Sequence, residues 1–332
     1  MHDLAVVIPA YKVQFFDKAL LSLSRQTNKN FTVYVGDDCS PGAIKAVCDK
    51  YNNLLSLHYH RFPSNLGGKD LVGQWERCAA LMNGEKWLWL FSDDDIAEDQ
   101  CVEYFYEALK KTNEGHDVYR FNTSVINEQD VDWAGADVSP EFENAMSLAK
   151  NILMGNRGNS MPDHIFRHSK YKELGGFINF DFAQAADWAT SINFAYDHGL
   201  YTIAGPKVKW RWSGQNVSSL AQANKKQMIG GHIQFLEWIN KRFTRSDETR
   251  CQVTLEEIRE ASLHNLNVII TTHYKGIPYA SLLSIAAKIA RIYDFSFWKA
   301  IKLCVAINYR MDSPQFKHRV KMVLTGKFLK RV

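Results

Sequence analysis

The sequence lacks the cysteine patterns of zinc-binding and disulfide-rich proteins. Its six cysteines are scattered over 332 residues, none is spaced as Cys-x-x-Cys, and no cysteine–histidine group has zinc-site spacing. Such scattered cysteines are typical of reduced thiols in the cytoplasm.

Long hydrophobic runs are also absent. No segment approaches the roughly 20 apolar residues that a membrane-spanning helix needs. The apolar run at residues 4–10 is too short for the core of an export signal. We therefore expect a cytoplasmic protein that is soluble or peripheral on the inner face of the cell membrane.

The chain has neither a large net charge nor a glycine-rich phosphate loop. The formal net charge is only +4, and we find no motif of a nucleic-acid-binding protein, so nucleic acid is not an expected partner. The first apolar run is followed by Pro9-Ala-Tyr-Lys-Val13 instead of a GxGxxG or P-loop sequence. This difference argues against dinucleotide and ATP enzymes, and it makes a nucleotidyltransferase a weak alternative.

Apolar strand-like runs alternate with helical patterns in the first hundred residues. We predict strands at residues 4–9, 31–36, 54–60 and 87–91. We predict helices at residues 15–26, 41–51, 69–82 and 98–111, the second of them with Ser40 as N-cap and Pro41 at the first position. This alternation predicts an α/β fold with a mostly parallel sheet flanked by helices.

The pattern loosens after residue 117 and becomes purely helical after residue 222. We expect strands at 117–127 and 164–167, a helix at 183–198, and a strand pair within 201–212 broken at Gly205-Pro206. Further helices are predicted at 222–243, 252–273, 278–293, 295–309 and 314–324. We place a boundary near residue 218, with an all-helical appendage over 219–332.

Polar residues follow the ends of the predicted strands. The clusters are Pro9-Ala10-Tyr11, Asp37-Asp38, the turn 65–69 and Asp93-Asp94-Asp95. In an open parallel sheet, ligands bind beyond the carboxyl ends of the strands. We therefore expect the clusters to meet at one edge and to form a binding site.

Three adjacent carboxylates repel one another unless a cation or water offsets their charge. A hard divalent ion, completed by substrate phosphates, suits Asp93-Asp94-Asp95 after a very apolar strand, although a solvated loop before a helix is the alternative. Tyr11 has two interpretations as well, since it either stacks on a base or lies at the edge of the core. Similarly, Asp38 either contacts base or ribose or caps a turn, and Lys69 either contacts phosphate or is solvated.

The order and spacing of four motifs resemble the family 2 glycosyltransferases and their GT-A fold. The motifs are Val-Val-Ile-Pro-Ala-Tyr (6–11), Val-Gly-Asp-Asp-Cys-Ser (35–40), Asn-Leu-Gly (65–67) and Phe-Ser-Asp-Asp-Asp (91–95). The resemblance covers about residues 4–218. It implies a catalytic domain over 1–218, with a nucleotide-binding half at 1–115 and an acceptor-side half at 116–218.

The resemblance also implies the residues of a donor site. Pro9, Ala10 and Tyr11 would lie against the base, and Asp38 would hold its edge, which is usually uracil. Lys69 would lie near the ribose or pyrophosphate. Asp93 would contact the ribose, and Asp94 would ligate Mn²⁺ or Mg²⁺, with Asp95 as a second carboxylate.

The later motifs resemble the acceptor side of the same family. Gly175-Gly-Phe177 followed by Asp187 resembles the segment that carries the catalytic base, and Trp210-Arg211-Trp212 resembles the element that closes on the pyrophosphate. By its position, the loop 156–163 is expected to contact the acceptor. Asp187 is therefore the expected base and Arg211 an expected donor-binding residue, although Asp187 without this context reads as an exposed acid on a helix.

The sequence departs from the family pattern at three positions. Ala186 stands where a glutamate often precedes the base, Ser92 replaces the first acid of the usual Asp-x-Asp motif, and Ser213 replaces a frequent histidine. The first change leaves the base with fewer neighbouring charges. The second leaves open which of the three aspartates binds the metal, and the third removes a possible metal or phosphate contact.

These features predict transfer of a sugar, with inversion, from a nucleotide-sugar. The expected donor is a UDP-sugar, and the expected acceptor is a hydroxyl of a glycan or of a lipid-linked oligosaccharide in bacterial surface polysaccharide biosynthesis. The alternative is a scaffold protein that binds nucleotide without catalysis, because the glutamate and the histidine are missing.

The last 46 residues are strongly basic. They contain eleven lysines and arginines but only two acids, Asp294 and Asp312. Around the start of this segment, apolar residues recur with helical spacing, and aromatic residues follow them. They are Leu282, Ile285, Ala286, Ile289 and Ile292, then Phe295, Phe297 and Trp298. One interpretation is a peripheral contact with an anionic membrane. The other is a helical appendage with a solvated basic face.

Overall fold

The computed structural model describes residues 2–134, 139–214 and 223–309. The chain divides into two compact units. Unit 1 contains residues 1–152 and 156–214, and unit 2 contains residues 153–155 and 215–332. The boundary expected near residue 218 lies outside the described residues.

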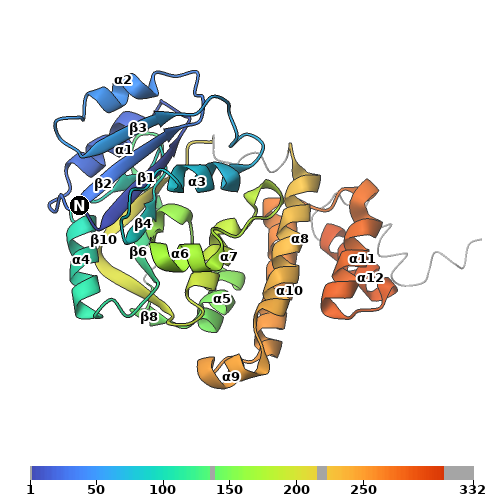
Figure 1. The fold of residues 1–332 in the computed structure, drawn as a ribbon. Helices are drawn as coiled ribbons and strands as arrows, with labels where there is room; N and C mark the ends of the chain where they lie inside the picture. The colour runs from blue at the N-terminus through green and yellow to red at the C-terminus, as the bar shows by residue number, and fades with distance from the viewer. Residues whose placement is uncertain (1, 135–138, 215–222, 310–332) are drawn as a thin grey trace, which may run out of the picture. The chain divides into compact units, whose positions relative to one another are not determined.

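Unit 1 is built on a ten-stranded sheet (Figure 1). Its strands are β1 (Leu4–Ala10), β2 (Phe31–Asp37), β3 (Leu57–Arg61), β4 (Trp87–Leu90), β5 (Ile96–Ala97), β6 (Val118–Ile126), β7 (Asp132–Ala134), β8 (Phe142–Glu143), β9 (His164–Arg167) and β10 (Leu200–Arg211). The strand order is β3-β2-β1-β4-β9-β6-β10-β5, with β7 on β6 and β8 on β10.

The nucleotide-side half of the sheet is parallel. Strands β3, β2, β1 and β4 run in one direction, and β6 and β10 are parallel to each other. Strand β9 lies antiparallel between β4 and β6. Because of this direction, the residues just before β9 lie at the carboxyl end of β4.

Helices cover both faces of the sheet (Figure 1). They are α1 (Phe16–Ser24), α2 (Ile44–Asp49), α3 (Leu71–Ala79), α4 (Cys101–Lys111), α5 (Ala145–Leu153), α6 (His168–Leu174) and α7 (Ala186–Phe194), with the short 3₁₀ helices η1 (Met161–Asp163) and η2 (Asp181–Ala183). The predicted α/β fold with helices flanking a mostly parallel sheet is confirmed.

Strand β4 is held by aromatic packing directly before the acidic triplet. The Trp87 ring packs edge-to-face against Phe105 and Tyr119, with centroids 5.5 and 5.4 Å apart. The Trp89 ring packs on Phe91 at 5.3 Å, and both are buried. Offset and edge-to-face aromatic contacts stabilise beyond their buried area. The triplet therefore starts from a rigid strand.

Two local predictions were wrong. Helix α2 begins at Ile44, with Ala43 as N-cap, and not at Pro41. The Ser40 hydroxyl donates to the Tyr11 carbonyl at 2.6 Å, so this side chain ties two strand-end loops together instead of capping the helix. The pair of strands expected within 201–212 is one strand, β10, whose register against β6 shifts between Ile203 and Lys207.

Unit 2 is helical, as predicted. Its helices are α8 (Lys225–Arg242), α9 (Arg245–Cys251), α10 (Leu255–Val268), the π-helical turn η4 (Ile269–His273), the 3₁₀ turn η5 (Tyr279–Ser281), α11 (Leu282–Tyr293) and α12 (Phe297–Tyr309). The predicted helix 314–324 and the basic residues after 309 lie outside the described part of the chain. Within residues 2–134, 139–214 and 223–309, none of the helices combines the length and apolar character needed to span a bilayer.

The apolar stripe predicted near residues 282–292 faces the inside of unit 2. Ile285, Ala286 and Ile289 are buried, in a helix that packs on α8 and α12. The stripe therefore stabilises the helical unit, and any membrane contact would need other residues.

Candidate active site

The strand-end clusters meet at the carboxyl edge of the parallel strands. Ala10 at the end of β1 pairs in register with Asp37 at the end of β2, and the Asp38 amide donates to the Ala10 carbonyl at 2.9 Å. Strand β4 lies on the other side of β1 and leads into the acidic triplet. Backbone pairing therefore brings together clusters that are more than 80 residues apart in the sequence.

Asp38 is buried and holds the turn that follows β3. Its Oδ1 accepts from the Leu66 amide at 2.7 Å, and its Oδ2 accepts from the Asn65 side chain and the Gly67 amide, both at 2.8 Å. The Arg77 guanidinium adds an ion pair. A Cβ at Gly67 would lie 2.8 Å from Oδ2, so this close approach requires glycine. In this arrangement, all four acceptor positions of the carboxylate are used.

The remaining predicted base-side residues differ in exposure. Ala10 is fully buried and Pro9 partly buried, whereas Tyr11 is 45% exposed at the rim. Lys69 is exposed in the turn that Asp38 holds, and its ammonium makes no ion pair with any described residue. Tyr11 and Lys69 are thus the two members of this group that a ligand reaches without rearrangement.

The side chain of Lys12 pairs with carboxylates of the acidic triplet. Asp93 Oδ2 accepts from the backbone amides of Tyr11 and Lys12 at 2.8 and 2.7 Å. The Lys12 ammonium forms an ion pair with Asp94 and lies 3.5 Å from Asp93 Oδ1. Burial lowers the pKa of Lys12, but Asp93 and Asp94 outweigh burial and the net pKa is raised. Burial and the charge of Asp94 raise the pKa of Asp93, which Lys12 opposes.

The two carboxylate oxygens of Asp95 differ in their hydrogen bonding. Its Oδ1 accepts from the Arg211 amide at 2.8 Å, whereas Oδ2 is buried without a hydrogen-bond partner among the described residues. Burial and the neighbouring Asp94 hold the pKa of Asp95 well above its usual range. A buried carboxylate oxygen without a donor is costly, so this position favours a cation.

The donor set fits a hard divalent cation that is shared with phosphate. The described residues contain no group of three or more histidine, cysteine, aspartate or glutamate side chains that would hold a metal by itself. Asp94, supported by Asp95, offers carboxylate oxygens at the sheet edge. Mg²⁺ and similar ions are often held by one or two carboxylates with substrate phosphates and water completing the shell.

Arg211 is buried beneath the acidic triplet. Its Nε donates to the Asp94 carbonyl at 2.7 Å, and its Nη1 donates to the Asn127 carbonyl at 2.8 Å. The same Nη1 forms a 2.6 Å ion pair with Asp130, and the guanidinium stacks on Phe15 at 4.4 Å. In this arrangement Arg211 fixes the loop that carries Asp94 and Asp95.

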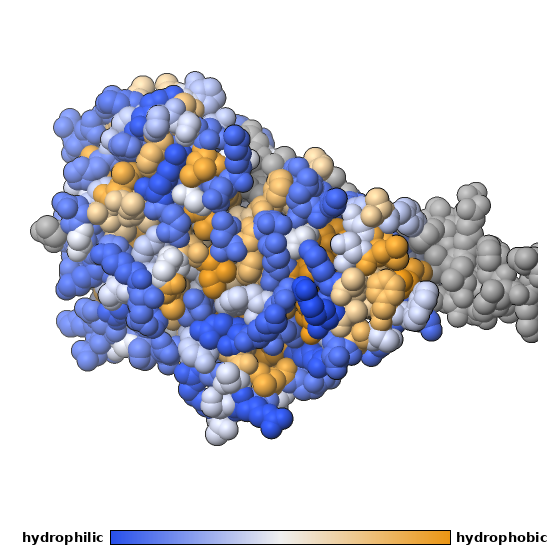
Figure 2. Space-filling model, turned by 45° about the vertical axis from the view of Figure 1, so that its right-hand side comes forward, coloured by the Kyte–Doolittle hydropathy of each residue, from blue (hydrophilic) through white to orange (hydrophobic). Residues whose placement is uncertain are grey.

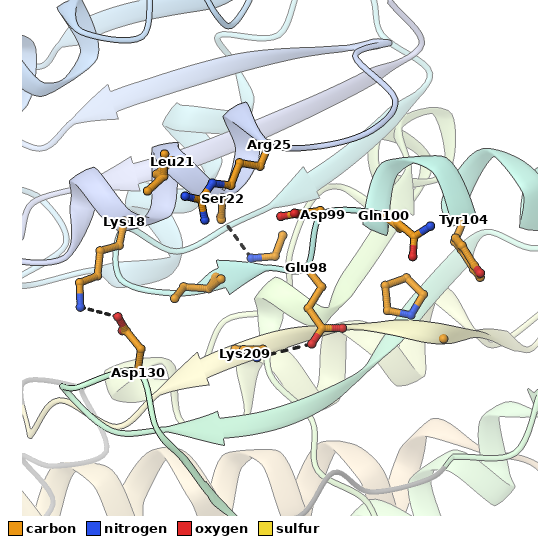
Figure 3. A pocket seen from close by; sticks show the side chains of 14 residues that line it. Lys18, Leu21, Ser22, Arg25, Glu98, Asp99, Gln100, Tyr104, Asp130 and Lys209 are labelled. Carbon is orange, nitrogen blue, oxygen red and sulfur yellow. Dashed lines mark hydrogen bonds and ion pairs between the residues drawn. The ribbon is translucent and has the colours of Figure 1, made fainter.

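A cavity of about 610 Å³ lies beside this loop, between α1, β5, α4 and β10 (Figure 3). Asp130 and Lys18 face each other across one end with a 2.6 Å ion pair, and Glu98 and Lys209 lie 3.5 Å apart. Since Asp130 also binds Arg211, the cavity wall is mechanically connected to the acidic triplet.

Asp187 lies in the first turn of α7, after a strained loop. Phe182, Ala183 and Ala185 have φ angles of 57°, 52° and 57°. These angles lie in the left-handed region, which is unfavourable for residues other than glycine. Each such residue costs on the order of 1–3 kcal/mol and is retained only where the surroundings enforce it. Such strain is typical of functional loops.

Helix α3 positions the segment that precedes this loop. The Glu76 carboxylate accepts from the Phe177 amide at 2.6 Å and from the Tyr171 hydroxyl. The Asn179 side chain donates to Asp70 at 3.0 Å. These bonds connect the helix after the Asn-Leu-Gly turn with the segment that leads to Asp187.

A second acid, Asp163, affects the pKa of Asp187. Asp187 is half-buried and not the exposed acid that its helical position alone suggests. Burial is the first cause that raises the pKa of Asp187 to about 7, and the negative charge of Asp163 adds to it. Asp163 is fully buried, and although burial raises its pKa, His164, Arg120 and Ser160 bring the net pKa below the usual value. Asp163 therefore remains charged, and it supplies a charge near Asp187 although Ala186 replaces the expected glutamate.

Sequence reasoning missed Lys12 and Glu76, and it included Asp163 only as the last residue of the loop 156–163 that was expected to contact the acceptor, without its effect on Asp187. Lys12 directly follows the motif at residues 6–11, at the end of a predicted strand. The expectation that this strand end meets the acidic triplet was the signal that could have identified Lys12. Asp163 lies before β9, and only the antiparallel placement of β9 brings it to the carboxyl end of β4, where the Trp89 indole donates to the Pro162 carbonyl at 2.6 Å.

Comparison with known proteins identifies a family and similar solved structures. Residues 5–173 match the model of the family described as Glycosyl transferase family 2. No curated protein matches the sequence.

Solved structures that resemble this chain include crystal structures of S. aureus TarS 1-349. The first is 16% identical, covers 91% of this chain and 90% of TarS 1-349, and gives a TM-score of 0.55. Its complexes with UDP and with UDP-GlcNAc are each 18% identical over the same shares, with TM-scores of 0.53 and 0.51. At this level of identity the likeness shows the fold alone.

Proposed function

Because the chain belongs to glycosyl transferase family 2, we propose that this glycosyltransferase transfers a sugar, with inversion, from a UDP-sugar to a hydroxyl group. Crystal structures of TarS with UDP and with UDP-GlcNAc support a uridine diphosphate donor. A glycan or lipid-linked oligosaccharide of a bacterial surface polysaccharide pathway is the acceptor that we propose.

One observation carries the proposal. The ends of β1, β2 and β4 gather Tyr11, Asp38 and the acidic triplet at one sheet edge. Asp163, whose charge acts on Asp187, lies at the carboxyl end of the same β4. The same sheet therefore positions a nucleotide site and a carboxyl group of raised pKa, as transfer to a hydroxyl requires.

We assign two donor contacts by exposure: Tyr11 stacks on the base, and Lys69 meets the diphosphate. The resemblance to the family, and not exposure, assigns the buried Asp93 to the ribose. Asp38 shapes the base pocket through the turn 65–67, and a direct contact with uracil would require one of its present donors to leave. Arg211 acts on the diphosphate side by fixing the loop of Asp94 and Asp95.

The transfer step needs one proton acceptor. The acceptor oxygen bonds to the anomeric carbon while the bond from that carbon to the diphosphate oxygen breaks, and the carboxylate of Asp187 takes the hydroxyl proton. Attack opposite to the leaving group inverts the anomeric centre. Mn²⁺ or Mg²⁺ at Asp94 and Asp95, when bound, would offset the charge on the leaving diphosphate.

Calorimetric titration tests the donor site. We expect UDP to bind the full chain more tightly with Mn²⁺ than with EDTA, and we expect slow release of UDP from UDP-GlcNAc when water replaces the acceptor. A protein that binds GDP or dTDP but not UDP would contradict the uridine assignment. A protein that binds none of the three would contradict the nucleotide site itself.

The pH dependence of UDP release tests the role of Asp187. Since the pKa of Asp187 is raised to about 7, the proton-accepting form is lost as the pH falls below 7. We expect kcat/KM to fall about tenfold per pH unit below this value and to level off above it. Asp163→Asn removes a negative charge that raises this pKa, so the bend in the pH profile, where kcat/KM levels off, should move to lower pH.

Asp163→Glu, which keeps the charge, is the matched control and should retain the bend near pH 7. An unchanged bend in Asp163→Asn would show that the two carboxyl groups do not interact.

We also propose a peripheral contact between unit 2 and an anionic membrane. Leu283, Phe297 and Trp298 are 62%, 43% and 71% exposed, and the Lys299 ammonium lies 3.7 Å above the Phe295 ring. Figure 2 shows hydrophobic residues gathered on the surface of the α11–α12 pair. Exposed aromatics beside lysine are typical of interfacial helices.

Vesicle sedimentation tests this contact. With phosphatidylglycerol vesicles, we expect Phe297→Ser/Trp298→Ser to lower the partition coefficient about tenfold, because two apolar side chains no longer enter the interface. Val131→Ser, which removes a side chain of unit 1 that is 58% exposed, should have no effect. Equal binding to pure phosphatidylcholine would contradict the electrostatic part of the proposal.

A further inference from the structure

The most unusual feature of the donor site is the ammonium group of Lys12. It forms an ion pair with Asp94 and lies 3.5 Å from Asp93 Oδ1. The lysine side chain is 26% exposed, whereas the two carboxylates are 4% and 6% exposed. Lys12 is therefore the most solvent-accessible of these three side chains.

The backbone holds Lys12 in this place. The Lys12 and Tyr11 amides both donate to Asp93 Oδ2, so the loop after β1 is fixed to the loop after β4. The Ser40 hydroxyl fixes the Tyr11 carbonyl from the end of β2. A surface lysine gains little from a single ion pair, but this one starts from a backbone anchored at three points.

Lys12 and a divalent cation need the same oxygen atoms. The ammonium binds Asp94 Oδ2, and Asp94 is the residue assigned to the metal. A free cation approaching Asp94 meets a positive charge at contact distance, and it must displace that charge without offering the lysine a new partner. Besides Asp94, the carboxylates whose charge acts on the Lys12 ammonium are Asp93 and Asp95 of the same triplet.

A nucleoside diphosphate changes this balance. Its phosphate oxygens give the ammonium a strong alternative acceptor and supply the remaining ligands of the cation. Nucleotide and cation can then enter together while the lysine moves from carboxylate to phosphate, and the net charge of the site stays close to constant.

We propose that, without nucleotide, the Lys12 ammonium holds the Asp94 oxygen that a divalent cation needs, and that it thereby makes cation binding dependent on the nucleoside diphosphate. This inference rests on the donor site proposed above and adds Lys12 to it as a positioning residue. In the complex, the Lys12 ammonium contacts the diphosphate, and the divalent cation takes its place at Asp94.

Binding of Mn²⁺ to the full chain, measured by the electron paramagnetic resonance signal of free Mn²⁺, tests the proposal without any turnover. Wild type should bind Mn²⁺ weakly alone and much more tightly with UDP. Lys12→Gln should bind Mn²⁺ at least about tenfold more tightly than wild type in the absence of UDP. Its gain on adding UDP should be correspondingly smaller.

Two variants control for the loss of a positive charge and for disturbed folding. Lys12→Arg keeps the charge and should exclude free Mn²⁺ as wild type does. Lys45→Gln breaks a 2.6 Å lysine–aspartate pair on α2 and should also behave as wild type. Circular dichroism of each variant checks that the fold is retained.

Equal affinities of wild type and Lys12→Gln for Mn²⁺ without nucleotide would overturn the proposal, provided that wild type binds UDP. Failure of wild type to bind UDP at any Mn²⁺ concentration is a separate result. It would overturn the donor site, and with it the role of Lys12.

Discussion

Replacing Asp187 with asparagine is expected to lower the rate of sugar transfer by about 10²- to 10⁴-fold, the range of a lost general base. Asparagine is nearly isosteric with aspartate, but it cannot accept the proton of the attacking hydroxyl. UDP affinity should stay within about twofold of wild type, because Asp187 lies outside the contacts assigned to the donor. The rate is measured as UDP release from UDP-GlcNAc, and the affinity by calorimetry.

Asp181→Asn is the matched control for this experiment. Asp181 is an exposed acid in η2, six residues before Asp187, and its substitution removes the same charge from the same segment. We expect nearly wild-type release from this variant. If Asp187→Asn retained full activity, another group would have to be the base. A parallel loss of UDP affinity would instead indicate a structural role for α7.

Replacing Asp94 with alanine is expected to remove most of the Mn²⁺ dependence of UDP binding. In the proposed site, Asp94 holds the cation that also binds the diphosphate, so its loss should weaken UDP binding in Mn²⁺ by about 10- to 100-fold, or ~1.4–2.7 kcal/mol. In EDTA no cation bridges to the carboxylate, so this loss should disappear, and the variant should bind UDP at least as tightly as wild type because Asp94 no longer pairs with Lys12.

Asp99→Ala provides the comparison for Asp94→Ala. Asp99 is an exposed acid five residues further along, on the wall of the cavity beside β5, and its loss should leave the Mn²⁺ effect intact. A full Mn²⁺ effect in Asp94→Ala would move the cation to Asp95, whose buried Oδ2 lacks a donor. The same titrations with Asp95→Ala would then identify the ligand.

The wrong helix start at Pro41 shows where local rules fail. Serine followed by proline is a good helix start, and the sequence alone favours it. In the folded chain, however, the Ser40 hydroxyl bonds the Tyr11 carbonyl, which belongs to a strand end 29 residues earlier. The Ser40 hydroxyl, which the local rule assigns to capping the helix, therefore forms a long-range hydrogen bond instead.

The apolar stripe of residues 282–292 illustrates a second limit. Its helical spacing predicted an amphipathic helix correctly, and α11 is that helix. Spacing does not say what covers an apolar face. In this case α8 and α12 cover it, and the exposed large apolar residues of α11 and α12 are instead Leu283, Phe297 and Trp298.

The sequence by itself determined the α/β fold, the family and the sheet edge where the site lies. Apolar runs ending in polar residues specify buried parallel strands, and parallel strands must bring their carboxyl ends to one edge. Tyr11, Asp38 and the acidic triplet are therefore placed by rules that need only local sequence and strand direction.

Only the tertiary structure decided which side chains these residues meet. Lys12 covers Asp94, Arg211 is buried under the acidic loop, and Asp163 raises the pKa of Asp187. These contacts join segments between 24 and 117 residues apart, as the hydrogen bond from Arg211 to the Asp94 carbonyl illustrates. Charge and hydrogen bonding act across space, so the partners of a buried group depend on the packing of the whole sheet.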